Sequence, residues 1–162
     1  MLRYLITLVL AIAGFIAQTQ EVLYLSNGSN ITITPGAILT VQGGLQMANG
    51  SSISNDGNLY INNNSISNQS NWTDNNVTGV FSALSTGMVY FQSANGHTIT
   101  GNTIFPSLTL DAVNGGATIN NSISIANNLI LKNGKFNTGS FQLIALNNAA
   151  NAVQADVANT NY

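Results

Sequence analysis

After its first twenty residues, the chain is built from short segments in which apolar and polar residues alternate. In the segment 31–34, Ile31 and Ile33 alternate with threonines, and no stretch repeats apolar residues at helical spacing over three turns. Alternation with a period of two predicts β-strands that bury one face. The other segments of this kind lie at 38–41, 45–47, 59–61, 88–91, 108–110, 117–119, 123–125, 129–131 and 141–146. We therefore expect an all-β protein.

Glycine-containing pairs separate the alternating segments. Asn-Gly readily adopts positive φ at both central positions of a tight turn, so each such pair predicts a turn. Residues 128–140 show the pattern in full, with a strand, a turn at Asn133-Gly134 and a new strand from Phe136. The other turn signals are the Asn-Gly pairs that begin at 27, 49, 95 and 114, with Pro35-Gly36 and Gly115-Gly116.

The spacing of the segments favours a parallel β-helix, or β-solenoid. Sandwich strands are about 5–6 residues long and meet antiparallel partners, whereas many segments here offer only two or three inward residues. In a β-solenoid, coils of roughly 20 residues stack about 4.8 Å apart. The chain would then form on the order of six or seven coils. An antiparallel β-sandwich is the alternative.

The composition suits such stacking. Only 5% of the residues are charged, against about 25% in ordinary soluble domains. Hydrophobic residues make up 44% of the chain, so the low charge does not indicate disorder. Like charges in neighbouring coils would repel each other, whereas stacked amides can form hydrogen-bonded ladders along the axis. We expect each coil to bury a short apolar face on a neighbour of the same shape.

Residues 1–17 have the pattern of a secretory signal peptide. Arg3 precedes an apolar stretch around 8–12, and small residues follow it. The stretch is too short for a comfortable membrane span, although an uncleaved anchor is an alternative. We expect cleavage after Ala17, or alternatively after Ala13, and a β-solenoid repeat domain over 18–162. The mature chain would be secreted or held at a bacterial cell surface, with no membrane span.

Loss of the leader removes Arg3 and leaves two lysines against five acidic residues, a formal net charge of −3. A chain so poor in cations lacks the groups that bind nucleic-acid phosphates or anionic membranes. We therefore expect no nucleic-acid partner. The chain has no cysteine, so after export it would depend on burial and hydrogen bonding without disulfides.

The alternation stops between residues 62 and 76, where the sole tryptophan lies among amides and hydroxyls. Sugar-binding surfaces combine an aromatic ring that stacks on a sugar with amides that bind its hydroxyls. We therefore select Trp72, Asn71, Asp74 and Asn76 as candidate ligand contacts. The structural alternative is a loop whose tryptophan covers an exposed coil.

The sequence shows no catalytic or metal-binding pattern. His97, the only histidine, follows Asn95-Gly96 and is expected in a surface turn. Glycoside hydrolysis needs two carboxylates across the scissile bond, but the aspartates lie singly along the chain, and only stacking could bring two together. We expect Asp56 and Asp74 to serve turns. We predict a non-enzymatic protein with no catalytic residue, cofactor or metal.

The second half resembles a known repeat. From Gly87 to about 146, the chain reads as a glycine-started strand, a Thr-Ile-x-Gly turn, Phe-x-x-Leu-x-Leu, then Leu-x-Leu-x-x-Gly and an Asn-Thr-Gly-Ser turn; residues 31–61 follow this order loosely. This order resembles the β-solenoid repeat region of large secreted or cell-surface, adhesin-like proteins of type IX-secreting bacteria. The matching residues are Gly87, Phe91, Ile99, Gly101, Phe105, Leu108, Leu110, Leu129, Leu131, Gly134 and 137–140.

The resemblance implies a structural or adhesin-like scaffold that presents loops to carbohydrate or to another cell-surface protein. The alternative function is a carbohydrate-binding or polysaccharide-degrading β-helix. Such proteins usually continue for hundreds of residues, so we also expect further β-solenoid sequence or a partner at the open C-terminal end.

Overall fold

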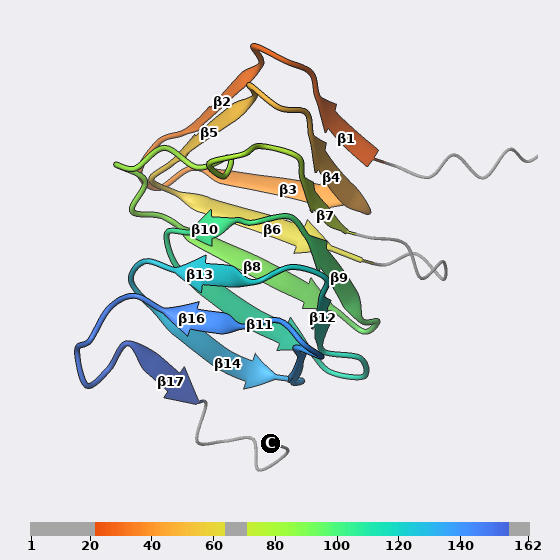
Figure 1. Ribbon diagram of the computed structural model, residues 1–162, viewed down its shortest axis with the longest axis vertical. Coiled ribbons are helices and arrows are strands. Elements are labelled where there is room, and N and C mark those ends of the chain that lie inside the picture. The colour runs from red at the N-terminus through yellow and green to blue at the C-terminus, as the bar shows by residue number, and fades with distance from the viewer. Residues whose placement is uncertain (1–21, 64–70, 156–162) are drawn as a thin grey trace, which may run out of the picture.

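The computed structural model describes residues 22–63 and 71–155, and all strand pairings in this part of the chain are parallel. The chain winds through six coils, and each coil adds strands to the faces of a stack, although the third coil adds none to the second face (Figure 1). The fold is therefore the predicted all-β solenoid, and the antiparallel sandwich is wrong. The signal peptide expected over 1–17 lies outside the described residues.

The first face is a six-stranded sheet in the order β1-β4-β7-β9-β12-β15. Each strand comes from the next coil along the chain. The strands are β1 (Val22–Leu25), β4 (Gly44–Met47), β7 (Trp72–Asp74), β9 (His97–Thr100), β12 (Ala117–Ile119) and β15 (Phe136–Asn137).

The second face is split into two sheets. The first coils contribute the pair β2-β5, and the last coils contribute β10-β13-β16. The strands are β2 (Asn30–Ile33), β5 (Ser52–Asn55), β10 (Ile104–Phe105), β13 (Ile123–Ile125) and β16 (Leu143–Ala145). The third coil has no strand in this position.

The third face is continuous from end to end, in the order β3-β6-β8-β11-β14-β17. The strands are β3 (Ile38–Gln42), β6 (Asn58–Asn62), β8 (Met88–Ser93), β11 (Leu108–Ala112), β14 (Leu129–Asn133) and β17 (Val153–Ala155).

The core consists of columns of apolar side chains that run along the stack. On the third face, equivalent positions in the six coils are aligned in register, so that one column is Leu39, Leu59, Val89, Leu108, Leu129 and Val153. Its members from β6, β8 and β11 are fully buried. Each such side chain contributes about 1.5–3 kcal/mol through burial, and none can move to the outer face without a register slip.

The glycine pairs turn the chain from one face to the next instead of closing hairpins. Gly36 has a φ of 78°, and the amide of Ala37 bonds to the carbonyl of Thr34 at 2.9 Å. Positive φ occurs only at glycines among the described residues, including Gly28, Gly50 and Gly134. The expectation of positive φ at both residues of each Asn-Gly pair is therefore wrong, because no asparagine of these pairs has positive φ and neither do Gly96 and Gly115.

Polar side chains connect neighbouring coils along the axis. Asn30 donates to the hydroxyl of Ser52, Asn120 donates to that of Thr100, and Asn147 donates to a backbone carbonyl one coil away. In these contacts the acceptor is a hydroxyl or a carbonyl, whereas the composition suggested ladders of like amides. The physical role is as expected, since uncharged groups stabilise adjacent coils without repulsion.

Candidate functional site

The third coil departs from the regular path. Successive coils elsewhere on the third face are shorter, but Asn58 of β6 pairs with Met88 of β8, 30 residues later. Part of the added length is the segment 75–87, which runs between β5 and β10 on the second face without forming a strand (Figure 1). Its only β-like contact is an isolated bridge between Ile53 and Phe81.

This departure leaves a hollow of about 270 Å³ beside β10. One wall is the segment 75–87 and the other belongs to the following coils. The hollow has apolar and hydroxyl-bearing residues but no charged one, and it is lined by Thr78, Gly79, Phe81, Ser82, Ala83, Ser85, Ile104, Pro106 and Ala126. A hollow with these walls fits a small neutral ligand with both apolar and hydroxyl surface.

A buried carboxylate holds the segment in place. Asp74 is 4% exposed. Its Oδ1 accepts hydrogen bonds from the amide and the side chain of Asn76, both at 3.0 Å. Its Oδ2 accepts from the amide of Val80 at 3.0 Å and from the hydroxyl of Thr103 at 2.8 Å. Asp74 therefore shapes the turn, as the sequence predicted, and also fixes the start of the hollow's wall.

Trp72 is fully buried, with an exposed fraction of 0%. It lies in β7 in register with Leu45 and Ile99, so the first face places it in an inward column. The expected stacking of a sugar on this indole is therefore wrong. The ring packs instead against Phe81 at 5.6 Å between centroids and 15° between planes. Phe81 lines the hollow, so Trp72 supports the hollow from behind.

The other two candidate contacts are also buried and bonded to the chain. Asn71 donates to the carbonyl of Gly43 at 3.2 Å. Asn76 accepts from the amide of Gly50 at 2.8 Å. Both side chains tie the third coil to the coil before it, so neither offers a free amide to a ligand. The rest of the predicted contact segment, 64–70, lies outside the described residues.

His97 is in the core and not in a surface turn. It begins β9, is 2% exposed and packs edge-on against Phe91 at 5.2 Å. Neither ring nitrogen has a hydrogen-bond partner in the described part of the chain. Burial lowers the pKa of His97 from 6.5 to about 4, so the ring is neutral near pH 7. The sequence suggested a turn at His97 because Asn95-Gly96 precedes it, but β9 begins at His97 itself, directly after this pair.

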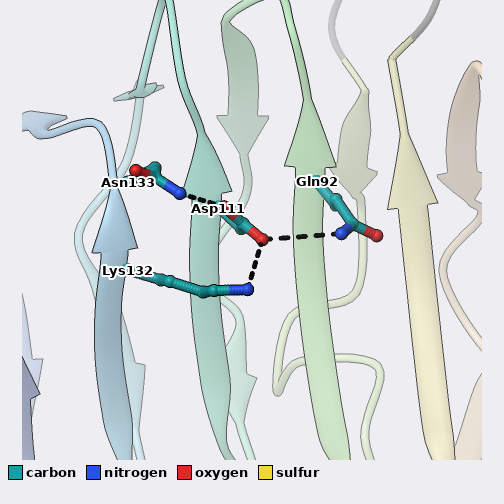
Figure 2. Close-up of polar contacts among 4 residues, drawn as sticks. All are labelled: Gln92, Asp111, Lys132 and Asn133. Carbon is teal, nitrogen blue, oxygen red and sulfur yellow. Dashed lines mark hydrogen bonds and ion pairs between the residues drawn. The ribbon is translucent and has the colours of Figure 1, made fainter. Parts of the chain in front are cut away.

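The third face carries a second polar cluster (Figure 2). Asp111 accepts from Lys132 at 3.1 Å, from Asn133 at 2.5 Å and from Gln92 at 3.5 Å. Burial alone would raise the pKa of Asp111, but the bonds from Asn133 and Lys132 and the lysine charge hold it below its usual value. The carboxylate therefore links three adjacent coils, and protein donors bond to both of its oxygens.

Two tyrosines lie beside this cluster on the same outer face. Tyr60 and Tyr90 occupy register positions in β6 and β8, and their rings stack at 4.4 Å with 6° between planes. Burial and the neighbouring Tyr60 raise the pKa of Tyr90. Each ring covers a face of the other, so the pair acts first as a stacked ladder that holds adjacent coils together.

The residues that line the hollow escaped sequence reasoning. Residues 77–84 contain apolar side chains without a period of two, and such a segment gives no strand signal. The only indication in the sequence was the interval of about 30 residues between the alternating segments 59–61 and 88–91, which is longer than one coil.

Comparison of the chain with protein-family models, with curated proteins and with solved structures finds no match. Within residues 22–63 and 71–155, no group of three or more histidine or acidic side chains gathers to hold a metal ion. The same residues contain no helix with the length and apolarity to cross a membrane.

Proposed function

We propose that the protein is a secreted or cell-surface, adhesin-like β-solenoid scaffold without catalytic activity. Its stacked coils form a stiff support, and the third coil presents the segment 75–87 to a carbohydrate or to another surface protein. The predicted leader peptide supports export. The resemblance of residues 87–146 to adhesin-like repeats supports the role of a scaffold.

The observation that carries the proposal is the hollow beside Phe81. One face of this ring packs on the buried indole of Trp72, and the residue also lines the hollow. An aromatic ring held from behind can stack on the apolar face of a sugar without first losing conformational freedom. The hydroxyls of Thr78 and Ser82 lie in the same wall and can bind sugar hydroxyls.

The absence of charge from the lining favours a neutral sugar. A uronic acid or a phosphate group would need a cationic partner to compensate for its lost hydration, and the lining residues provide none. A neutral hexose matches the lining, because its ring carbons and hydroxyls form separate apolar and polar edges.

Nothing specific favours polysaccharide cleavage, the alternative activity of such a fold. Retaining and inverting hydrolases both need two carboxyl groups that face the scissile bond. Here Asp74 is committed to the third-coil network and Asp111 to the cluster of the third face. Asp56 accepts from the amide and the hydroxyl of Thr86.

Glycan binding by the purified chain tests the proposal, with Ala83→Trp as the diagnostic variant. Ala83 is exposed and lines the hollow, so an indole there would occupy the space without entering the core. Ala94→Trp is the matched control, because Ala94 is an exposed alanine in the bend directly after β8, away from the hollow. We expect neutral glycans to bind the wild type and the control, and Ala83→Trp to weaken binding at least about tenfold.

Two results would contradict the proposal. Equal binding by both tryptophan variants would remove the hollow as the contact. Release of reducing ends from a polysaccharide, with loss of release in an Asp→Asn variant, would make the protein an enzyme. Labelling of intact producing cells with an antibody tests the location, and a signal only after lysis would contradict surface display.

A further inference from the structure

Both ends of the described stack carry unpaired strand edges. Among the described residues, the edge strands β1, β2 and β3 pair only with the second coil, and β15, β16 and β17 pair only with the fifth. The ends lie at opposite extremes of the stack (Figure 1). Edge strands with free N–H and C=O groups bind further strands unless charge, proline or a covering segment prevents it.

The strands of these two coils provide no such protection. The sequences are VLYL, NITI and ILTVQ at one end and FN, LIA and VQA at the other, without a charge or a proline. Repeat proteins usually need terminal repeats with a polar outer surface to remain soluble. Here apolar side chains are exposed at both ends, with Leu23 at 37% and Val153 at 52%.

We infer that copies of this chain stack head to tail, with the last coil of one copy placed on the first coil of the next. The inference is independent of the proposed sugar contact. All described pairings within the chain are parallel. The free edge of the last coil and the free edge of the first coil therefore have the same strand direction and complementary hydrogen-bonding groups. Head-to-tail contact would continue the ladder of hydrogen bonds in the same strand direction, and β15, β16 and β17 would meet β1, β2 and β3.

The inward columns also continue across the junction. Within one copy, Leu129 of the fifth coil pairs with Val153 of the sixth. In the next copy, the equivalent position is Leu39, which begins the same column. Val153 would therefore pack on Leu39 of the next copy much as it packs on Leu129 in its own.

The N-terminal end offers space for this contact. A hollow of about 440 Å³ opens there, lined by Val22, Leu23, Thr40, Val41 and Gln42. Its apolar residues Val22, Leu23 and Val41 would pack against a further coil. Because the two surfaces of the contact differ, the association is heterologous and does not close, so it predicts linear series of copies rather than a defined dimer.

Sedimentation velocity on the purified chain tests the inference. We expect the wild type to form dimers and longer series as its concentration rises. Leu23→Lys blocks the N-terminal end and Val153→Lys blocks the C-terminal end. Each should weaken association at least about a hundredfold, since the junction would bury an unpaired ammonium group. Mixing the two variants should restore a dimer, because the intact C-terminal end of Leu23→Lys can contact the intact N-terminal end of Val153→Lys. Nothing larger should form, since both outer ends of that dimer are blocked.

Outward neighbours provide the controls. Tyr24→Lys and Gln154→Lys place the same charge one residue away, on the outer faces of β1 and β17, and should leave association unchanged. Circular dichroism checks that all four variants fold. A wild-type chain that stays monomeric overturns the inference. Self-association of either blocked variant alone overturns it too, since that requires contact between like ends.

Discussion

The indole nitrogen of Trp72 donates a 2.9 Å hydrogen bond to the hydroxyl of Thr103, and both side chains are fully buried. The same hydroxyl donates to Asp74 at 2.8 Å. A chain of two hydrogen bonds thus links the first face to the fourth coil, and through Asp74 to the segment beside the hollow. Because all of these groups are shielded from water, the loss of one leaves the others unsatisfied.

Replacement of Thr103 by valine tests this chain of bonds. The volume stays nearly constant, but Trp72 loses its acceptor and Asp74 loses a donor. We expect a loss of about 2–3 kcal/mol in the free energy of unfolding, measured by chemical denaturation. Thr103→Ser keeps the hydroxyl and should cost less than about 1 kcal/mol for the lost methyl group. Equal stability of the two variants would show that the bonds contribute little.

The sequence predicted the parts of the fold in which alternation is strong. Segments such as 59–61 and 108–110 are strands of the third face, and the stack has six coils, within the range expected from coil length. The strands that were not predicted are β1, β5, β7, β9, β10 and β17, and two of them show one reason. In β7 the pattern Trp-Thr-Asp has a polar residue at an inward position, and in β9 a histidine takes that position. Period-two patterns identify strands only when the inward residues are apolar.

The candidate site shows a second limit of sequence reasoning. Trp72 is surrounded by polar residues along the chain, but its spatial neighbours are Phe81 and Phe91 from elsewhere in the third coil and Phe105 from the fourth. Stacking brings together residues about one coil apart, and local sequence does not reveal which of them widen the core. The missing strand of the third coil creates room for this aromatic cluster, and that absence has no local signature.

His97 predicts a specific pH dependence of stability. In the unfolded chain the imidazole takes up a proton below pH 6.5, whereas in the folded protein its pKa is about 4. The contribution of the neutral ring is fully present above pH 6.5 and is lost as the pH falls toward 4, with a total of about 3 kcal/mol. Urea denaturation at pH 7.5 and at pH 5 measures the larger part of it, about 2 kcal/mol.

His97→Phe separates this contribution from that of the carboxylates. The phenyl ring keeps an aromatic contact with Phe91 and cannot take up a proton. Between pH 7.5 and pH 5, the variant should lose clearly less stability than the wild type. An identical loss in the two proteins would mean that His97 is not the group responsible.

Gly57 tests the close approach of neighbouring coils. A Cβ atom at this position would lie 2.4 Å from the carbonyl oxygen of Ala37 and 2.6 Å from that of Thr34. Gly57→Ala should therefore push two coils apart and lower the free energy of unfolding by about 3 kcal/mol or more.

Gly28→Ala is the control for that substitution. Gly28 has a φ of 79°, but a Cβ atom there would meet nothing within 4 Å, so alanine should cost only the backbone strain of about 1–2 kcal/mol. Thermal and urea unfolding measure both variants. If Gly57→Ala lowers the free energy of unfolding less than Gly28→Ala does, neighbouring coils lie farther apart at Gly57 than these distances indicate.

The distance between two spin labels on the outer column of the third face measures the register of the coils. Thr40, Ile130 and Gln154 belong to that column, in the first, fifth and sixth coils. With labels at Thr40→Cys and Gln154→Cys, diluted in unlabelled protein, we expect a separation of about 24 Å, and about 19 Å for Thr40→Cys with Ile130→Cys. Distances that do not increase by one strand spacing per coil would rule out a parallel stack in register.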